Sequence, residues 1–83
     1  MKQNEIKNTI VDYLKVGNPL IAKLDEIPMD ESLVELGLMD SFGVIDIVTF
    51  LEVRFSIKIE DEEITKEQFG SINKMANLVA NKI

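Results

Sequence analysis

The sequence predicts an all-α fold, a small four-helix bundle made of three main helices and one short helix. Residues 3–15, 41–55 and 71–83 place apolar side chains at the 3.6-residue spacing of a helix with a buried face. Residues 56–59 alternate like a strand but have no second strand to pair with, so we expect an extended loop there. The chain of 83 residues is long enough for one domain with one modest core, which we expect over residues 1–83.

The first helix is predicted over residues 3–15. Its apolar side chains recur at i, i+4, i+7 and i+8, at Ile6, Ile10, Tyr13 and Leu14. Gly17, followed by Asn18 and Pro19, ends the pattern. The helical spacing makes Tyr13 a core residue with its hydroxyl at the edge of the core, in preference to a catalytic phenol.

Residues 17–39 form a long connection between the first two main helices. We expect short helical turns near residues 20–23 and 32–36. A loop of this length in a compact domain has its own packing residues or a function. We therefore expect an ordered crossover held on the bundle by five apolar anchors, Leu20, Leu24, Ile27, Leu33 and Leu36.

The central helix is predicted over residues 41–55, with Asp40 as its N-cap. The Asp40 carboxylate would accept a hydrogen bond from the N–H of Phe42 or Gly43. Ser41 then takes the first helical position, with its hydroxyl in solvent at the positive end of the helix. Glycine costs roughly 1 kcal/mol in a helix, so we interpret Gly43 as leaving room for a group to approach Ser41. The alternative is an ordinary cap pair followed by a tolerated glycine.

The central helix is apolar on two sides. An arc of about 100° is expected to face the core and holds Val44, Ile47, Val48, Leu51 and Phe55. The opposite stripe holds Phe42, Asp46, Thr49 and Val53. Because a helix that is apolar on both sides is normally covered on both, we expect the second stripe to face another protein.

The C-terminal third contributes a short helical turn near residues 61–66 and the last helix, residues 71–83. The acids beside the turn lack the ordered Asp-x-Asp-x-Asp-Gly spacing of a calcium loop, so we expect no specific metal site. Ser71 is expected to cap the last helix, and Phe69 to pack on its first turn. The apolar face of this helix is Ile72, Met75, Ala76, Val79 and Ile83.

Composition excludes several classes of function. The chain has no Cys and no His, so it has no disulfide, no Cys-based metal site and no Ser–His catalysis. No GxSxG or SxxK pattern surrounds Ser41, which argues against a serine hydrolase. Residues 24–63 carry a net charge of −10 and each flanking segment carries +2, giving −6 in total. This distribution repels nucleic acid and anionic membranes and favours partners with basic patches.

The stretch from Leu36 to Val48 is the most distinctive part of the chain. It contains Leu36-Gly37, then Asp40-Ser41-Phe42, then Ile45-Asp46-Ile47-Val48. Together these segments resemble the prosthetic-group site of acyl carrier proteins, and the resemblance runs from Asp30 through Ile72. Two departures from the family pattern bear on the pathway more than on the carrier role. Phe42 stands where carriers of fatty-acid synthesis usually have Leu, and Val53-Arg54 replaces part of a normally acidic stretch.

The resemblance implies a stand-alone carrier protein with the acyl carrier type of bundle and no catalytic activity of its own. In that family the matching serine, Ser41 here, carries 4'-phosphopantetheine, and acyl or aminoacyl groups are held on this arm as thioesters. The implied partners are a phosphopantetheinyl transferase and the enzymes that load and process the acyl or aminoacyl group, acting in trans on a monomer. The sequence leaves the cargo open.

We expect partners to contact the outward stripe of the central helix together with the acids near Ser41, namely Asp40, Phe42, Asp46, Thr49, Glu52 and Val53. The rival interpretation is an unmodified acidic interaction module that docks through the same stripe, which leaves the placement of Ser41 and Gly43 accidental. No stretch approaches 18 consecutive apolar residues, and the N-terminal residues lack the apolar run of a signal peptide. We therefore expect a cytoplasmic protein.

Overall fold

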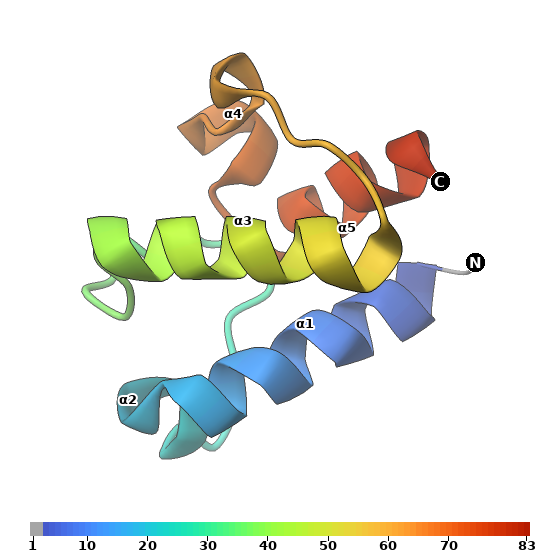
Figure 1. The fold of residues 1–83 in the computed structure, drawn as a ribbon. Coiled ribbons are helices and arrows are strands. Elements are labelled where there is room, and N and C mark those ends of the chain that lie inside the picture. The colour runs from blue at the N-terminus through green and yellow to red at the C-terminus, as the bar shows by residue number, and fades with distance from the viewer. Residues whose placement is uncertain (1–2) are drawn as a thin grey trace.

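The computed structural model describes residues 3–83, and its regular structure there is entirely helical. The three main helices are α1 (Gln3–Gly17), α3 (Ser41–Phe55) and α5 (Ile72–Lys82). The short elements are α2 (Pro19–Ala22), the 3₁₀ turn η1 (Asp61–Glu63) and α4 (Lys66–Phe69). The described residues contain no strand, and residues 57–60 form an extended loop (Figure 1). The predicted all-α fold is confirmed, whereas residues 1 and 2 of the expected domain lie outside the described part.

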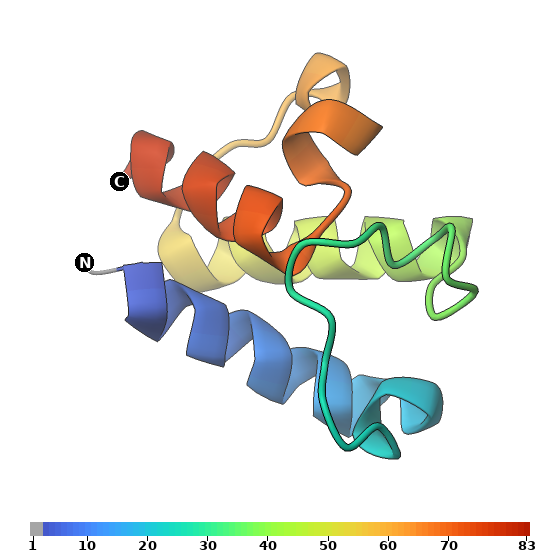
Figure 2. The same ribbon diagram turned by 180° about the vertical axis from the view of Figure 1, so that it is seen from behind.

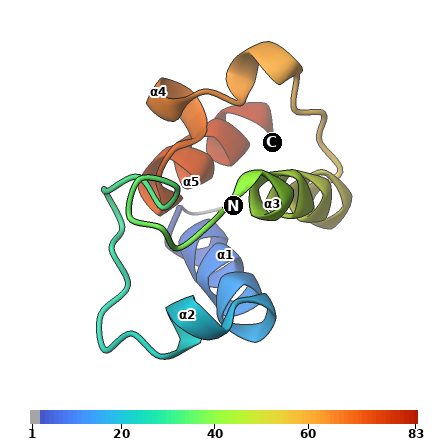
Figure 3. The same cartoon turned by 90° about the vertical axis from the view of Figure 1, so that its left-hand side faces the viewer.

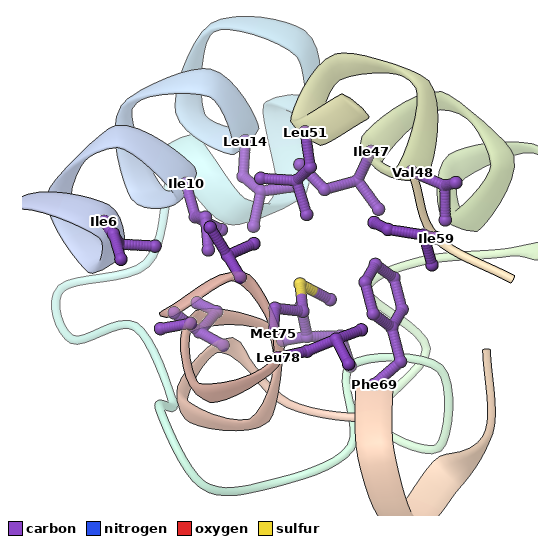
Figure 4. Packing of buried hydrophobic residues seen from close by; sticks show 14 of the residues in the cluster. Ile6, Ile10, Leu14, Ile47, Val48, Leu51, Ile59, Phe69, Met75 and Leu78 are labelled. Carbon is purple, nitrogen blue, oxygen red and sulfur yellow. The ribbon is translucent and has the colours of Figure 1, made fainter. Parts of the chain in front are cut away.

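The core forms where α1, α3 and α5 meet, and Figure 4 shows their apolar side chains pointing toward one another. The predicted inward face of α3 is confirmed, since Ile47, Val48, Leu51 and Phe55 are buried and Val44 packs half-buried against them. Burying each side chain of this size contributes about 1.5–3 kcal/mol relative to exposure. The three main helices are therefore held by their apolar faces rather than by helix propensity alone.

The long connection is an ordered crossover, as predicted, and it passes over the start of α5 (Figure 2). The Asn73 N–H donates to the Met29 carbonyl at 2.9 Å, and the Leu33 N–H donates to the Gly70 carbonyl at 3.2 Å. The Asn73 side-chain amide also donates to the Asp30 carboxylate. These bonds fix the connection before it turns toward α3.

The anchors predicted for this connection are only partly right. Leu33 is buried and Ile27 packs against the core, but Leu20, Leu24 and Leu36 are exposed at 56, 36 and 46%. In α2 the residue that enters the core is Ile21, and a neighbour one position away points about 100° around the helix. Residues 33–37 form hydrogen-bonded turns close to the helical turn predicted near residues 32–36, but Leu36 is not buried there.

The short turn predicted near residues 61–66 is η1, and the sequence prediction missed α4 behind it. Thr65 begins α4 by accepting a hydrogen bond from the Gln68 N–H at 3.2 Å. Ser71 caps α5 as predicted, accepting from the Lys74 N–H at 3.2 Å. A salt bridge of 2.8 Å from Lys82 to Glu63 joins η1 to α5. The hydrogen bond that Lys82 donates in this salt bridge lowers the pKa of the Glu63 carboxyl. Ile83 lies beyond the end of α5 and is exposed, contrary to prediction.

Candidate functional site

The start of α3 has the predicted geometry, with a capped helix N-terminus and an exposed serine. The Asp40 backbone is extended, and its Oδ1 accepts a hydrogen bond from the Gly43 N–H at 2.9 Å. The Asp40 carbonyl accepts the next one, from the Val44 N–H at 3.0 Å. Ser41 is the first residue of α3 and is exposed. The Asp40 carboxylate is thus engaged with its own helix, while the Ser41 hydroxyl lies at the positive end.

The backbone that leads into Ser41 is fixed on both sides. Gly37 has a φ of +75°, a left-handed conformation that glycine adopts without strain, and it closes a turn onto the Val34 carbonyl at 3.0 Å. The Leu38 carbonyl then accepts a hydrogen bond of 2.6 Å from the Asn18 side-chain amide. Asn18 Oδ1 also caps α2 by accepting from the Leu20 and Ile21 N–H groups. One asparagine therefore ties α2 to the segment before Ser41.

Gly43 has a packing role that differs from the interpretation made from the sequence. A Cβ at this position would lie 2.7 Å from Cγ of Met39, whose side chain is buried under the first turn of α3. Two non-bonded carbon atoms do not approach this closely, so a side chain here would require a shift of the backbone or of Met39. The space beside Gly43 is therefore filled by Met39, and it is not room left for a group approaching Ser41.

The outward stripe of α3 is exposed as predicted, with Ile45 as an additional apolar residue and Glu52 in another role. Phe42 and Val53 are 82% and 76% exposed, and Asp46 and Thr49 are exposed as well. Ile45, at 63% exposure, extends the apolar surface beside Ser41 and was not predicted. Glu52 is half-buried, and its carboxylate accepts a 2.9 Å hydrogen bond from the Ile59 N–H, so it holds the loop that follows α3.

Asp46 is joined to α1 through Tyr13. The Tyr13 hydroxyl donates to both carboxylate oxygens of Asp46 at 2.9 Å, and its ring stacks on Phe50 with a centroid separation of 3.8 Å. The hydrogen bond to Asp46, with burial and the negative charge as smaller causes, raises the pKa of the Tyr13 hydroxyl above 10.0. The hydroxyl lies at the edge of the core as predicted. Its hydrogen-bond partner Asp46 was not predicted from the sequence and is 33 residues away in the chain.

Two hollows border the segment that precedes Ser41. An apolar cavity of about 330 Å³ lies between this segment and α4, with Leu33, Met39, Val44, Phe69 and Met75 in its wall. A more open groove of about 470 Å³ lies on the side of α2, lined by Gly17, Asn18, Leu20, Gly37, Leu38, Met39, Asp40 and Gly43. Met39 borders both. The groove includes Asp40 and Gly43, the residues on either side of Ser41 and Phe42.

The described residues show neither a metal site nor a membrane span. Among residues 3–83 no three Asp or Glu side chains gather closely enough to hold a metal ion. Over the same part of the chain, no helix has both the length and the apolar character needed to cross a bilayer.

Comparison with known proteins identifies one family over nearly the whole chain. The family described as "Phosphopantetheine attachment site" matches residues 4–79. The chain is 30% identical to the D-alanyl carrier protein of Streptococcus suis (strain 05ZYH33) over 71 residues, which cover 86% of each chain. It is also 30% identical to the acyl carrier protein of Petrotoga mobilis (strain DSM 10674 / SJ95) over 79 residues, 95% of this chain and 84% of that protein.

Proposed function

This chain belongs to the phosphopantetheine attachment site family, and on that premise we propose that Ser41 is the residue that carries the arm. The chain is a carrier protein whose prosthetic group is 4'-phosphopantetheine, and it is not itself an enzyme. When attached, the group supplies a terminal thiol on which acyl or aminoacyl groups form thioesters. The observation that supports Ser41 is its exposure at the first position of a capped helix.

The residues around Ser41 suit a phosphodiester at that position. The Gly43 N–H bonds to Asp40, and the N–H groups of Ser41 and Phe42 lie at the open, positive end of α3. Attraction of an anion to such an end is worth roughly 0.3–1 kcal/mol, and the charge of Asp40 opposes it. Retention does not depend on this balance, because the arm is bound covalently. The local structure instead presents the hydroxyl on a rigid backbone.

Incubation with coenzyme A and a phosphopantetheinyl transferase, followed by intact mass and peptide mapping, tests the assignment. Wild type should gain one arm on the peptide that contains Ser41, and Ser41→Ala should gain none. Ser56→Gly is the matched control, because Ser56 is the other exposed serine and its φ of 55° suits glycine. An arm found on Ser41→Ala, or none on wild type, would overturn the proposal.

For partner recognition, we propose that the transferase and the loading and processing enzymes contact Asp40, Phe42, Asp46, Thr49, Glu52 and Val53. Support comes from the exposed apolar side chains that flank Ser41 and from the acids interleaved with them. Basic and apolar docking patches on the partners would complement this surface. We propose further that the carrier acts as a monomer in the cytoplasm, where coenzyme A supplies the arm.

The cargo class is the finer part of the proposal. The names of the relatives include both D-alanyl and acyl carriers at 30% identity. We therefore propose an aminoacyl or acyl thioester. Loading the holo-protein separately with a D-alanine-activating enzyme and with an acyl-activating enzyme, and measuring the intact mass, distinguishes the two classes.

A further inference from the structure

Hydrogen bonds within the protein fix the shape of the groove beside Ser41. Figure 3 looks onto the end of the molecule that holds both α2 and the start of α3. Asn18 holds the two walls at a fixed separation, because its amide donates to the Leu38 carbonyl and its oxygen accepts from the first turn of α2. These bonds belong to the protein itself, so the groove does not need a ligand to hold it open.

Two glycines keep the groove unfilled. A Cβ added at Gly17 or at Gly37 would meet no heavy atom within 4 Å. The left-handed φ of Gly37 explains that glycine, but Gly17 ends α1 without a positive φ and without a close neighbour. Glycine within a helix is destabilising relative to alanine, and Gly17 is still part of α1. The effect of Gly17 on the surface is to leave the backbone at the end of α1 uncovered.

The lining of the groove combines groups of three kinds. Asp40 and Gly43 belong to the N-terminus of α3, which favours an anion. Gly17 belongs to the C-terminus of α1, where carbonyl groups lack partners within the helix and accept hydrogen bonds. Leu20 and Leu38 add apolar side chains. An occupant should therefore combine an anionic group, an apolar part and hydrogen-bond donors.

We propose that the phosphopantetheine arm attached to Ser41 lies in this groove, against Leu20 and Leu38, with its amides directed to the end of α1. The inference rests on the proposed attachment at Ser41. The arm carries groups of these three kinds, namely a phosphodiester, a carbon with two methyl groups, and two amides. It is also tethered between two residues of the groove wall, which raises its local concentration there without any added affinity. The cavity on the other side of Met39 has a mostly apolar wall.

The test compares apo- and holo-protein by NMR, with intact mass measured first. In wild-type holo-protein, nuclear Overhauser effects should join the methyl groups of the arm to those of Leu20 and Leu38. The Asn18 and Leu20 amides should shift between the apo and holo forms, although they lie far from Ser41 in the sequence. Shifts confined to residues 40–44, or contacts from the arm to Leu33 and Phe69 instead, would overturn the inference.

Gly17→Leu places a side chain in the groove, and because a Cβ there has open space, the fold should be retained. Its holo form should lose the contacts between the arm and Leu20. Val16→Leu is the matched control, since it puts a leucine in the same turn of α1, at a residue that is 90% exposed and outside the groove. That variant should keep the contacts. Absence of modification in wild type would refute the attachment at Ser41, whereas normal modification without contacts would refute the groove alone.

Discussion

At the scale of single residues, the contact between Gly43 and Met39 predicts whether a substitution at Gly43 lowers or raises the free energy of unfolding. Gly43→Ala would gain roughly 1 kcal/mol of helix propensity. It would also force a Cβ to within 2.7 Å of Cγ of Met39, which is a middle atom of that side chain and cannot swing away freely. Overpacking of this kind costs about 1–3 kcal/mol. We expect a net loss of up to roughly 2 kcal/mol in the free energy of unfolding, measured by urea denaturation.

The matched control removes the Met39 side chain beyond its Cβ. In a Met39→Ala background the space beside Gly43 is vacant, so Gly43→Ala should become stabilising, by roughly 1 kcal/mol. A loss of stability of the same size in both backgrounds would show that the cost at Gly43 does not come from Met39. Modification of Ser41 should proceed in both variants, since neither change touches its hydroxyl.

Tyr13→Phe isolates the hydrogen bond to Asp46, because the ring that stacks on Phe50 is kept. Loss of one hydrogen bond at this partly buried position should lower the free energy of unfolding by about 1 kcal/mol. The pKa of Tyr13 is raised in the folded state, so the neutral hydroxyl is the stabilising form. The advantage of wild type over Tyr13→Phe should therefore be fully present at neutral pH and shrink as the pH rises beyond about 10. An advantage that grows above pH 10 would contradict this pairing.

The residue-scale interactions that were predicted from the sequence are the local ones. The caps at Asp40 and Ser71 join residues three apart, so their residue types and spacing are visible along the chain. The pairs Tyr13–Asp46 and Asn18–Leu38 join residues 33 and 20 apart, and they exist only because helices pack at particular angles. The same applies to Met39 beneath Gly43, where the sequence shows an unfavourable glycine but not the neighbour that requires it.

At the scale of the element, α3 has one face for the core and one for partners, and a pair of variants separates them. Phe42→Ala removes a side chain that is 82% exposed, so it should leave the fold intact while weakening transferase binding by about 1–3 kcal/mol, mainly through faster release. Leu51→Ala removes a fully buried side chain and should lower the free energy of unfolding by about 2–5 kcal/mol. Equal destabilisation by both, with unchanged modification kinetics for Phe42→Ala, would contradict this assignment of faces.

Asp46→Lys tests whether charge on the same face directs the encounter. Reversing the charge should slow association with a basic partner and flatten its dependence on salt, as measured by stopped-flow kinetics. The variant also loses the hydrogen bond from Tyr13, so Tyr13→Phe is the control that removes the bond but keeps the charge. If Tyr13→Phe slows association as much as Asp46→Lys, the position of the carboxylate matters more than its sign.

Elements differ in how far their sequence determines them. The three main helices carry long apolar periodicities, and α3 was predicted at its observed bounds of Ser41 and Phe55. The single-turn helices α2 and α4 contain too few residues for a period, and they depend on their caps at Asn18 and Thr65. Leucines in the connection misled the prediction, because neither irregular structure nor a single helical turn has a period that tells which side chains turn inward. Leu20 is one of these, and its exposure helps to form the groove beside Ser41.

For the whole molecule, the dominant electrostatic feature is an excess of acids in the middle of the chain. Residues 24–63 carry −10, and many of these carboxylates lie exposed on the connection, on α3 and on η1. A folded domain of this length has a total stability of only about 4–12 kcal/mol. Because this total is small, even a modest repulsion among the acids at low ionic strength should have a measurable effect on stability. The salt bridge of Lys82 with Glu63 offsets it at one place.

Salt should raise the melting temperature, because screening weakens repulsion between the carboxylates more than it weakens one partly exposed ion pair. Thermal melts followed by circular dichroism between about 10 mM and 300 mM NaCl, where the screening length falls from roughly 30 Å to below 8 Å, would measure the effect. A double variant, Asp61→Asn with Glu62→Gln, removes two exposed charges from η1 and should show a higher melting temperature at low salt and a smaller rise with salt. A melting temperature that falls with salt, or an equal rise in both proteins, would mean that the acidic surface does not limit stability and that its role is confined to partner recognition.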